Sequence, residues 1–256
     1  MDEPLIIDTL HLDWDYTALA AHYRLRAPYS THALHALFEL MQLPPASACV
    51  DIGAGTGRLT AALVAQHWQV TAIEPNAAMR EFGRTDVPQA RWLAASGDAT
   101  GLPDRCARVV TFGSSFNVLP ATAALDESAR LLDDGGWLVC LWNHRDLDDA
   151  LQAHLQGVIE AQVPGYAHGS RRDDPTVSIA AHGAFEDIRC ITGPVSHRVR
   201  ADDFVDGFRA HATLVRQAGD RMPAALAALA ASLHGRDELV VPFTTRIFVA
   251  RRRAHS

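Results

Sequence analysis

The sequence has no apolar run of the roughly 18 residues that a membrane-spanning helix needs, so we expect no membrane segment. It contains only four cysteines, and none of them belongs to a Cys-x-x-Cys pair, which favours a reducing compartment. Basic charge is scarce as well. The net charge is −7 and the isoelectric point is near 6.0, which argues against a nucleic-acid partner. These absences are typical of a cytoplasmic globular protein.

Signals for targeting and for metal binding are weak too. The acidic first residues, 1–4, precede no long apolar run, so we expect no secretion signal. The arginine run at 251–253 is expected to be a solvated end rather than a binding patch. His32 and His35 have a helical spacing, but no third or fourth ligand lies nearby in sequence, so no metal site is expected. Both a monomer and a homodimer fit these features.

The first half of the chain has a regular order of elements. A helix is predicted over 31–42, where four apolar residues form one stripe: Leu34, Leu37, Phe38 and Met41. Strands and helices then alternate as far as Trp142. This alternation predicts a parallel sheet with helices on both faces.

The second half is less regular. The pattern predicts helices over 147–163, 201–219 and 223–234, with a polar loop between 164 and 175. It also predicts a strand over 185–199 and a last strand over 239–249 that is interrupted internally. No linker is evident, and 256 residues suit one large domain over 1–256.

The nine residues 50–58, Val-Asp-Ile-Gly-Ala-Gly-Thr-Gly-Arg, are the most informative segment. Three glycines at alternate positions let the backbone turn sharply and let a ligand lie against bare peptide. A helix predicted over 59–67 begins at once and leaves unpaired N–H groups at its start. Arg58 stands where a dinucleotide fingerprint needs its third glycine, and the Gly-Lys-Ser/Thr of a P-loop is absent. For the glycines alone, an ordinary tight turn remains the alternative.

Acidic and polar residues follow the next predicted strands. Strand 69–73 ends at Glu74, about 20 residues past the glycine loop, where an acid suits the two hydroxyls of a ribose. Strand 92–95 leads to Asp98, and strand 109–112 leads to a Gly-Ser-Ser-Phe-Asn loop. A helix over 121–132 and a fifth strand over 137–142 follow. In open parallel sheets, ligands bind at this carboxyl edge of the strands.

The order Asp-x-Gly-x-Gly-x-Gly, Glu74 and Asp98 resembles the class I S-adenosylmethionine (SAM) methyltransferases over about residues 16–145. The lead-in segment 22–29, His-Tyr-Arg-Leu-Arg-Ala-Pro-Tyr, resembles the type 11 small-molecule methyltransferases in particular. The resemblance implies an α/β, Rossmann-like, doubly wound sheet of seven mostly parallel strands with an antiparallel last strand. It also implies a helical lead-in at 1–44 and a helical lid inserted at 200–236. The implied cofactor is S-adenosyl-L-methionine. The implied activity is methyl transfer to a small-molecule metabolite, as in biosynthesis.

The resemblance also implies which residues hold the cofactor. The glycine loop packs on the methionine part, Glu74 binds the ribose and Asp98 accepts from the adenine amino group. A Tyr or Arg of the segment 22–29 helps to hold the carboxylate. The expected cofactor-binding residues are Tyr23, Arg26, Tyr29, Asp51, Gly53, Ala54, Gly55, Thr56, Gly57, Glu74, Pro75, Met79, Asp98, Ala99 and Ser114.

The loop after the fourth strand departs from the look-alikes. Many of them have Ala-Phe-His-Trp where this chain has Ser-Phe-Asn-Val at 115–118, and an asparagine cannot act as a general base. The expected catalytic groups are Asn117, His144, Tyr166 and His211, and the expected substrate-binding groups are Phe116, Asn143, Arg145, Arg171 and Arg172. The arginine pair suggests a carboxylate or phosphate on the substrate. For the histidines and the arginine pair, structural or surface roles remain the alternative.

Three other functions fit the same motifs. A nucleophile that attacks the aminobutyl chain of SAM gives alkyl transfer or intramolecular cyclisation and releases methylthioadenosine. A SAM-binding protein without catalysis serves as a partner or regulator. A NAD-dependent enzyme is the remaining alternative, and the displaced third glycine argues against it.

Overall fold

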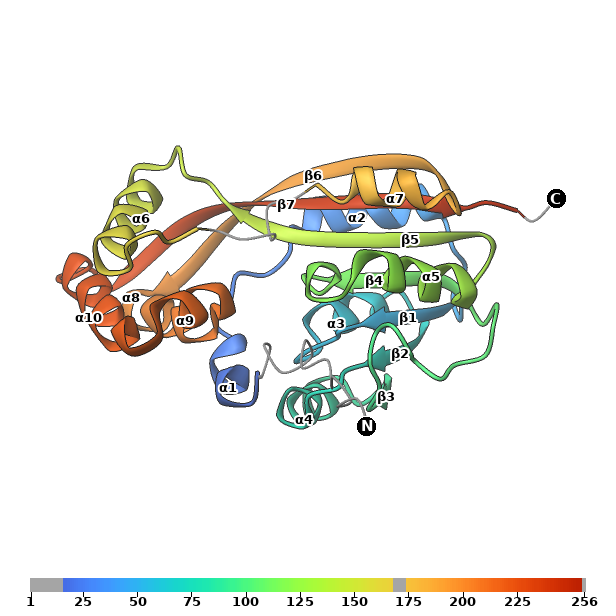
Figure 1. Ribbon diagram of the computed structural model, residues 1–256, viewed down its shortest axis with the longest axis horizontal. Helices are drawn as coiled ribbons and strands as arrows, with labels where there is room; N and C mark the ends of the chain where they lie inside the picture. Colours follow the sequence, from blue (N-terminus) through green and yellow to red (C-terminus); the bar gives the residue numbers. More distant parts are fainter. Residues whose placement is uncertain (1–15, 168–173, 255–256) are drawn as a thin grey trace, which may run out of the picture.

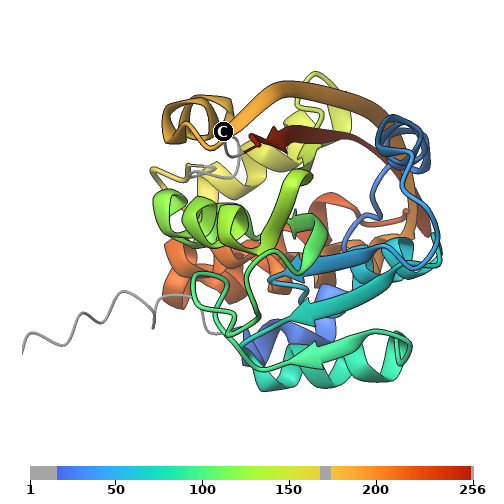
Figure 2. The same ribbon diagram turned by 90° about the vertical axis from the view of Figure 1, so that its right-hand side faces the viewer.

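The computed structural model describes residues 16–167 and 174–254. Seven strands form one sheet in the order β3-β2-β1-β4-β5-β7-β6 (Figure 1; Figure 2). The strands are β1 (Ala48–Ile52), β2 (Gln69–Ile73), β3 (Arg91–Leu93), β4 (Ala107–Gly113), β5 (Leu132–Arg145), β6 (Phe185–Arg200) and β7 (Glu238–Arg252). The first five pair in parallel, and β7 is antiparallel to both of its neighbours. The predicted mostly parallel sheet with an antiparallel last strand is confirmed.

Helices cover both faces of this sheet. They are α1 (Ala20–Tyr23), α2 (Thr31–Met41), α3 (Arg58–Val64), α4 (Ala77–Asp86), α5 (Ala121–Leu131), α6 (Ala150–Gln162), α7 (Thr176–His182), α8 (Ala201–Gly207), α9 (Ala212–Ala218) and α10 (Met222–Ser232). Trp137, Val139 and Leu141 of β5 pack with α2 and α3, whereas the alternate residues Leu138 and Cys140 pack with α5 and α7. This period of two is the pleat of a strand buried on both faces.

A third apolar core lies beyond the end of the sheet. The helices α6, α8, α9 and α10, which we call the helical cap, bury Leu155, Phe204, Leu214 and Leu229 together with Val241 of β7. Strands β6 and β7 run past the parallel strands and reach this cap (Figure 1). Residues between β6 and β7 therefore supply most of the cap, and α6 adds the rest.

Several predicted boundaries were wrong for local reasons. The helix predicted over 201–219 is broken at His211, whose ψ of 82° is not helical. Helix α6 begins later than predicted because the side chain of Asp149 accepts a hydrogen bond from Gln152 N and caps it there. Strand β5 extends beyond the predicted 137–142 in both directions.

The interruption predicted in the last strand is absent. Strand β7 continues through Pro242, which pairs with Ser196 of β6. The pairing between β5 and β7 ends at Phe243, so Pro242 has a neighbouring strand on one side only. A proline is tolerated where the ladder needs no N–H from it.

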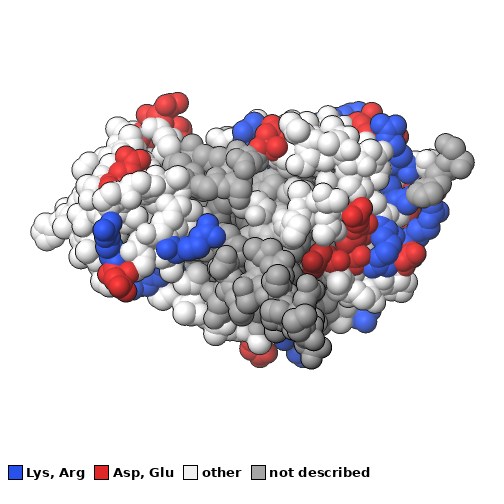
Figure 3. Space-filling model, in the orientation of Figure 1, with Lys and Arg blue, Asp and Glu red and all other residues white. Residues whose placement is uncertain are grey.

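The surface carries charges of both signs. They gather at the end of the molecule near the C-terminus (Figure 3), where Asp134 pairs with Arg105 and Arg252, and Glu186 pairs with Arg253. Within 16–167 and 174–254, no helix combines the length and the apolar character that crossing a bilayer requires.

Candidate functional site

The glycine loop follows β1 at the carboxyl edge of the sheet. Gly53, Gly55 and Gly57 have φ of 65°, 57° and 86°, a region that side chains disfavour. At Gly53 a Cβ atom would lie 2.4 Å from the Cβ of Ser115, so the loop also approaches the segment after β4 too closely for any side chain. Glycine is therefore required at position 53 both by the backbone conformation and by the close approach of Ser115.

Asp51 lies at the floor of the loop. Its carboxylate is buried and accepts hydrogen bonds from the hydroxyls of Thr60 at 2.7 Å and Thr111 at 2.8 Å. Burial raises the pKa of Asp51 to about 6, although both hydrogen bonds act in the opposite direction. No arginine or histidine of the described residues forms an ion pair with it. A cation placed beside Asp51 would therefore be strongly favoured.

Ser114, at the end of β4, has a φ of 63°, which is strained for a residue with a side chain. Its hydroxyl lies 3.1 Å from the hydroxyl of Tyr29, which comes from the segment before α2. Burial raises the pKa of Tyr29 to about 12, so this phenol stays protonated. Strained side-chain-bearing residues of this kind cluster at ligand sites.

These groups line a pocket that reaches from the glycine loop to the helical cap. Its lining is formed by the glycine loop, the ends of β4 and β5, and α8 of the cap. The pocket brings together thirteen predicted site residues: Tyr23, Arg26, Tyr29, Asp51, Gly53, Ala54, Gly55, Thr56, Ser114, Asn143, His144, Arg145 and His211.

Three residues predicted for catalysis or substrate binding lie outside this pocket. Asn117, in the turn Phe116–Val118, accepts a hydrogen bond from the indole of Trp142 at 3.0 Å. Phe116 packs edge to face on Phe112 in the core beneath the sheet. Tyr166 packs within the core of the cap. Asn117, Phe116 and Tyr166 therefore do not line the pocket, because each is used in packing.

The predicted ribose and adenine residues lie along the same sheet edge but also outside the pocket lining. Glu74 is buried and accepts hydrogen bonds from Gly55 N and Asn76 N, each at 2.8 Å. Burial raises its pKa, although these bonds oppose the rise. Asp98 accepts from the hydroxyl of Ser96. The roles of these residues stay predictions, as do those of Pro75, Met79 and Ala99.

Gly57 serves packing rather than pocket lining. A Cβ there would lie 3.0 Å from Val87 and 3.2 Å from the indole of Trp92. Its left-handed conformation starts α3, so the third glycine of the loop shapes the backbone without facing the cavity.

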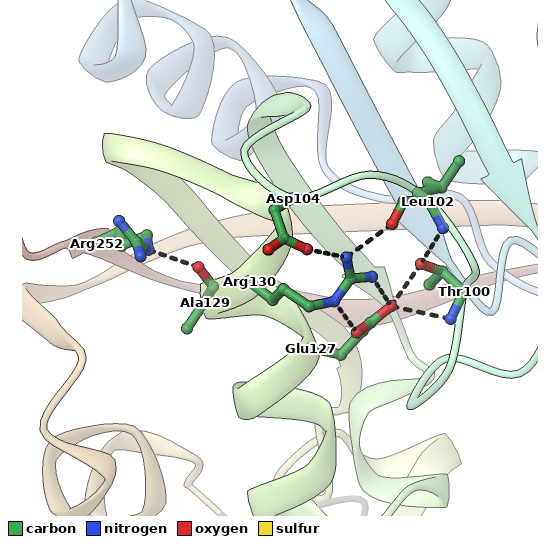
Figure 4. Close-up of polar contacts among 7 residues, drawn as sticks. All are labelled: Thr100, Leu102, Asp104, Glu127, Ala129, Arg130 and Arg252. Carbon is green, nitrogen blue, oxygen red and sulfur yellow. Dashed lines mark hydrogen bonds and ion pairs between the residues drawn. The ribbon is translucent and has the colours of Figure 1, made fainter.

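The loop that follows Asp98 is held by an ion network around the buried Glu127 (Figure 4). Glu127 accepts from Thr100 N at 2.9 Å and from Arg130, whose guanidinium also donates to Leu102 O and to Asp104. Burial opposes ionisation of Glu127, but the bonds from Arg130 and Thr100 outweigh it and hold its pKa below the ordinary value. The network fixes α5 to the loop beside Asp98.

The cap side of the pocket is built from distant segments. Asn143 of β5 donates to Ala27 O at 3.1 Å and Pro28 O at 2.7 Å, so it fixes the segment after α1. Arg145 donates to Gln152 at 2.7 Å and thereby joins β5 to α6. His211 caps α9, because its Nδ1 accepts from Leu214 N at 3.2 Å. Arg171 and Arg172 lie outside the described residues.

Two polar side chains of the pocket escaped the sequence predictions. Arg58, the first residue of α3, donates to Arg24 O at 2.6 Å and lines the cavity. His197 comes from β6, whose pairing with β7 carries it to the pocket. The motif spacing identified Arg58 only as a replacement for glycine, and no motif marked His197.

Comparison with known proteins supports this arrangement. A family model described as a methyltransferase domain matches residues 50–140. An uncharacterized methyltransferase of Mycobacterium tuberculosis is 34% identical over 131 residues, which is 51% of this chain and 52% of that protein. The chain thus spans about half the length of the curated relatives it matches.

Solved structures share the whole fold at low identity. A protein assigned to methyl transfer in an antibiotic biosynthesis pathway of Anabaena variabilis has a TM-score of 0.62 and 19% identity, over 88% of this chain and 98% of that one. The [4+2]-cyclase SpnF has a TM-score of 0.61 and 15% identity, over 96% and 97%. The matched motif region and these likenesses agree: residues 50–140 are similar to a methyltransferase domain, and the sheet as a whole has the fold of the solved methyltransferase structures.

Proposed function

We propose that this protein transfers a methyl group from S-adenosyl-L-methionine to a small-molecule acceptor. The observation that carries the proposal is one continuous pocket with the buried carboxylate of Asp51 at one end and the polar groups of β5 and the cap at the other. The protein is one SAM-binding domain over 1–256, with a helical lead-in and a cap.

The residues present fit the cofactor. SAM supplies a methyl group already activated on a positively charged sulfur. Asp51 offers a buried anion to the positive part of the ligand, and the backbone of 53–56 offers bare peptide. Arg26 and Tyr23 face the same space and suit a carboxylate, as the sequence predicted. Glu74 and Asp98 are assigned to the ribose and the adenine.

The cap suits a small acceptor. Phe204, Phe208 and Phe243 line the pocket opposite the glycine loop, so a bound acceptor lies among aromatic rings instead of water. Alignment of two ligands and exclusion of water are the main contributions a protein makes to such a transfer. A pocket covered by the aromatic rings of the cap favours a metabolite over a macromolecule.

The fate of SAM tests the proposal. Purified protein is incubated with SAM alone and with SAM plus a small-molecule extract, and both mixtures are analysed by mass spectrometry. Adenosylhomocysteine that forms only with the extract supports methyl transfer, and a methylated product identifies the acceptor. Methylthioadenosine would instead show attack on the aminobutyl chain. SAM that binds but stays intact with every extract would leave a binding protein.

A further inference from the structure

The charges that line the pocket are unequal in sign. Among the described residues of the lining, a single carboxylate, that of Asp51, stands against three arginines: Arg26, Arg58 and Arg145. SAM itself adds more positive than negative charge, because its sulfonium and ammonium groups outweigh its carboxylate. The pocket therefore keeps an excess of positive charge when SAM is bound, and a negatively charged acceptor would reduce that excess.

The guanidinium of Arg58 donates only one hydrogen bond to the described part of the protein. Its Nη2 atom donates to Arg24 O at 2.6 Å. It forms no ion pair with any described residue, and its side chain is only half-buried. A guanidinium has several N–H donors in one plane, so Arg58 can also donate to a ligand in the pocket that it lines.

The other two arginines of the lining have different surroundings. Arg26 lies over the ring of Tyr23, with its guanidinium carbon 5.0 Å from the ring centroid, in the segment assigned to the cofactor carboxylate. Arg145 is held to α6 by the side chains of two glutamines. With Arg26 assigned to the carboxylate of SAM, Arg58 remains for an anionic group on the acceptor.

An apolar wall begins close to Arg58. The residue after Arg24, whose carbonyl receives the bond from Arg58, is Leu25. A Cβ atom at Gly207 would lie 3.7 Å from the Cβ of Leu25, so the end of α8 packs directly on this segment. The next residue, Phe208, lines the pocket, as does Leu25. Direct contacts therefore join the cation to the apolar wall.

The wall itself is aromatic. The rings of Phe204 and Phe208 meet edge to face with centroids 5.3 Å apart, and Phe243 of β7 lines the same cavity. Such rings offer a large apolar surface to a ligand. Between residues 204 and 243, the described part of the lining contains no acid that would attract a cationic acceptor.

We propose that the acceptor is a small organic anion, an apolar compound that carries a carboxylate or a phosphate, and that Arg58 binds this negative group. The inference rests on the proposed function and names its class of substrate. A guanidinium binds a carboxylate or a phosphate through two parallel hydrogen bonds, which fix the orientation of the bound group. The aromatic rings hold the apolar body of the acceptor beside it.

Ion exchange tests the charge of the acceptor before its identity is known. A small-molecule extract is passed over an anion exchanger at pH 7, and the retained compounds and the flow-through are each incubated with the protein and SAM. We expect adenosylhomocysteine to form with the retained, anionic compounds. Formation mainly with the flow-through, which holds neutral and cationic compounds, would overturn the inference and leave the proposed function intact. Formation with no fraction of the extract would contradict the proposed function itself.

Substitution of Arg58 tests which group it binds. Arg58→Gln keeps a hydrogen-bond donor but removes the charge. We expect the KM for the acceptor, measured in dilutions of the retained fraction, to rise about 10- to 100-fold while kcat and the calorimetric SAM affinity stay near their wild-type values. Arg58→Lys keeps the positive charge and should cause a smaller rise. Arg84→Gln is the matched control, because Arg84 is exposed on α4 and lies outside the lining.

The two arginines near the lead-in should separate cofactor from acceptor. Arg26→Gln should weaken SAM binding and leave the KM for the acceptor near its wild-type value. If Arg58→Gln instead weakens SAM binding and leaves the KM for the acceptor unchanged, Arg58 binds the cofactor carboxylate and the inference is wrong. A KM for the acceptor that is unchanged in Arg58→Gln, with SAM affinity also unchanged, would equally overturn it.

Discussion

The two sides of the pocket differ in how they are built and in their charge. The glycine-loop side comes from one short segment and the adjoining parallel strands, and its floor is the carboxylate of Asp51. The cap side draws on the segment after α1, on β5, on β6 and on the cap, and its polar groups are arginines, histidines and an asparagine. One side is suited to a positively charged ligand, and the other to orienting an acceptor.

The two buried carboxylates, Asp51 and Glu127, sharpen this contrast. Glu127 is paired with Arg130, which stabilises its charge and holds its pKa down. Asp51 has only two hydroxyl partners, and its pKa is raised. The ionised carboxylate of Glu127 stabilises the fold. The ionised carboxylate of Asp51 destabilises the fold and is ready for a cationic ligand.

The largest expected effect is at the glycine loop. Gly53→Ala introduces a Cβ atom 2.4 Å from that of Ser115 at a φ of 65°. We expect a loss of about 4 kcal/mol in the free energy of unfolding, measured by urea denaturation, together with loss of SAM binding. Gly101→Ala is the matched control, since Gly101 has a φ of 71° but no atom within 4 Å of the added Cβ. Equal losses in the two variants would show that backbone strain alone, without close packing, requires the glycine.

The next largest loss of stability is expected in the ion network between Glu127 and Arg130 of α5. Glu127→Ala leaves Arg130 without its buried partner and should cost about 3 kcal/mol at neutral pH. Because the folded pKa of Glu127 is lowered, its contribution is present above the unfolded pKa and is lost as the pH falls. Urea denaturation at several pH values should show the gap to wild type closing below about pH 4.5. A gap that persists there would mean that packing, rather than charge, accounts for the loss.

Asp51→Asn should raise the stability of the ligand-free protein, whereas the two preceding substitutions lower it. The folded pKa of about 6 exceeds the ordinary 3.8, so ionisation destabilises the folded protein as the pH rises through this window. Without ligand, the variant should be more stable than wild type at pH 8, by on the order of 2 kcal/mol, and equal to it below pH 4. Calorimetry should show roughly 10-fold weaker SAM binding, with the exposed Glu39→Gln as control. Equal affinities would remove Asp51 from the cofactor site.

The smallest expected effect tests whether Asn117, which lies outside the pocket lining, takes no part in catalysis. Asn117→Ala leaves the buried indole N–H of Trp142 without this acceptor and should cost about 1 kcal/mol of stability. SAM affinity and the rate of adenosylhomocysteine formation should remain at wild-type values. A loss of turnover greater than tenfold would return Asn117 to the catalytic groups.

Local sequence signals predicted the sheet and the glycine-loop side well. The three glycines, the acid before them and the strand ends lie close together in sequence, so their geometry follows from turns and periodicity. The same signals did not say where the side chains of Asn117 and Phe116 point, because a residue at a strand end can turn toward Trp142 or the core as readily as toward the cavity. Nor did they show that Tyr166 packs in the core of the cap.

The sequence by itself determined the order of strands and helices, the need for glycine at the loop and the acid at its floor, because these depend on neighbouring residues. The residues on the cap side of the pocket, opposite the glycine loop, could be identified only from the tertiary structure. Pairing of β6 with β7 brings His197 and Phe243 to the same pocket as the glycine loop, although these residues lie far apart in the chain. Which side chains share a cavity depends on contacts between distant segments, and spacing along the chain does not encode those contacts.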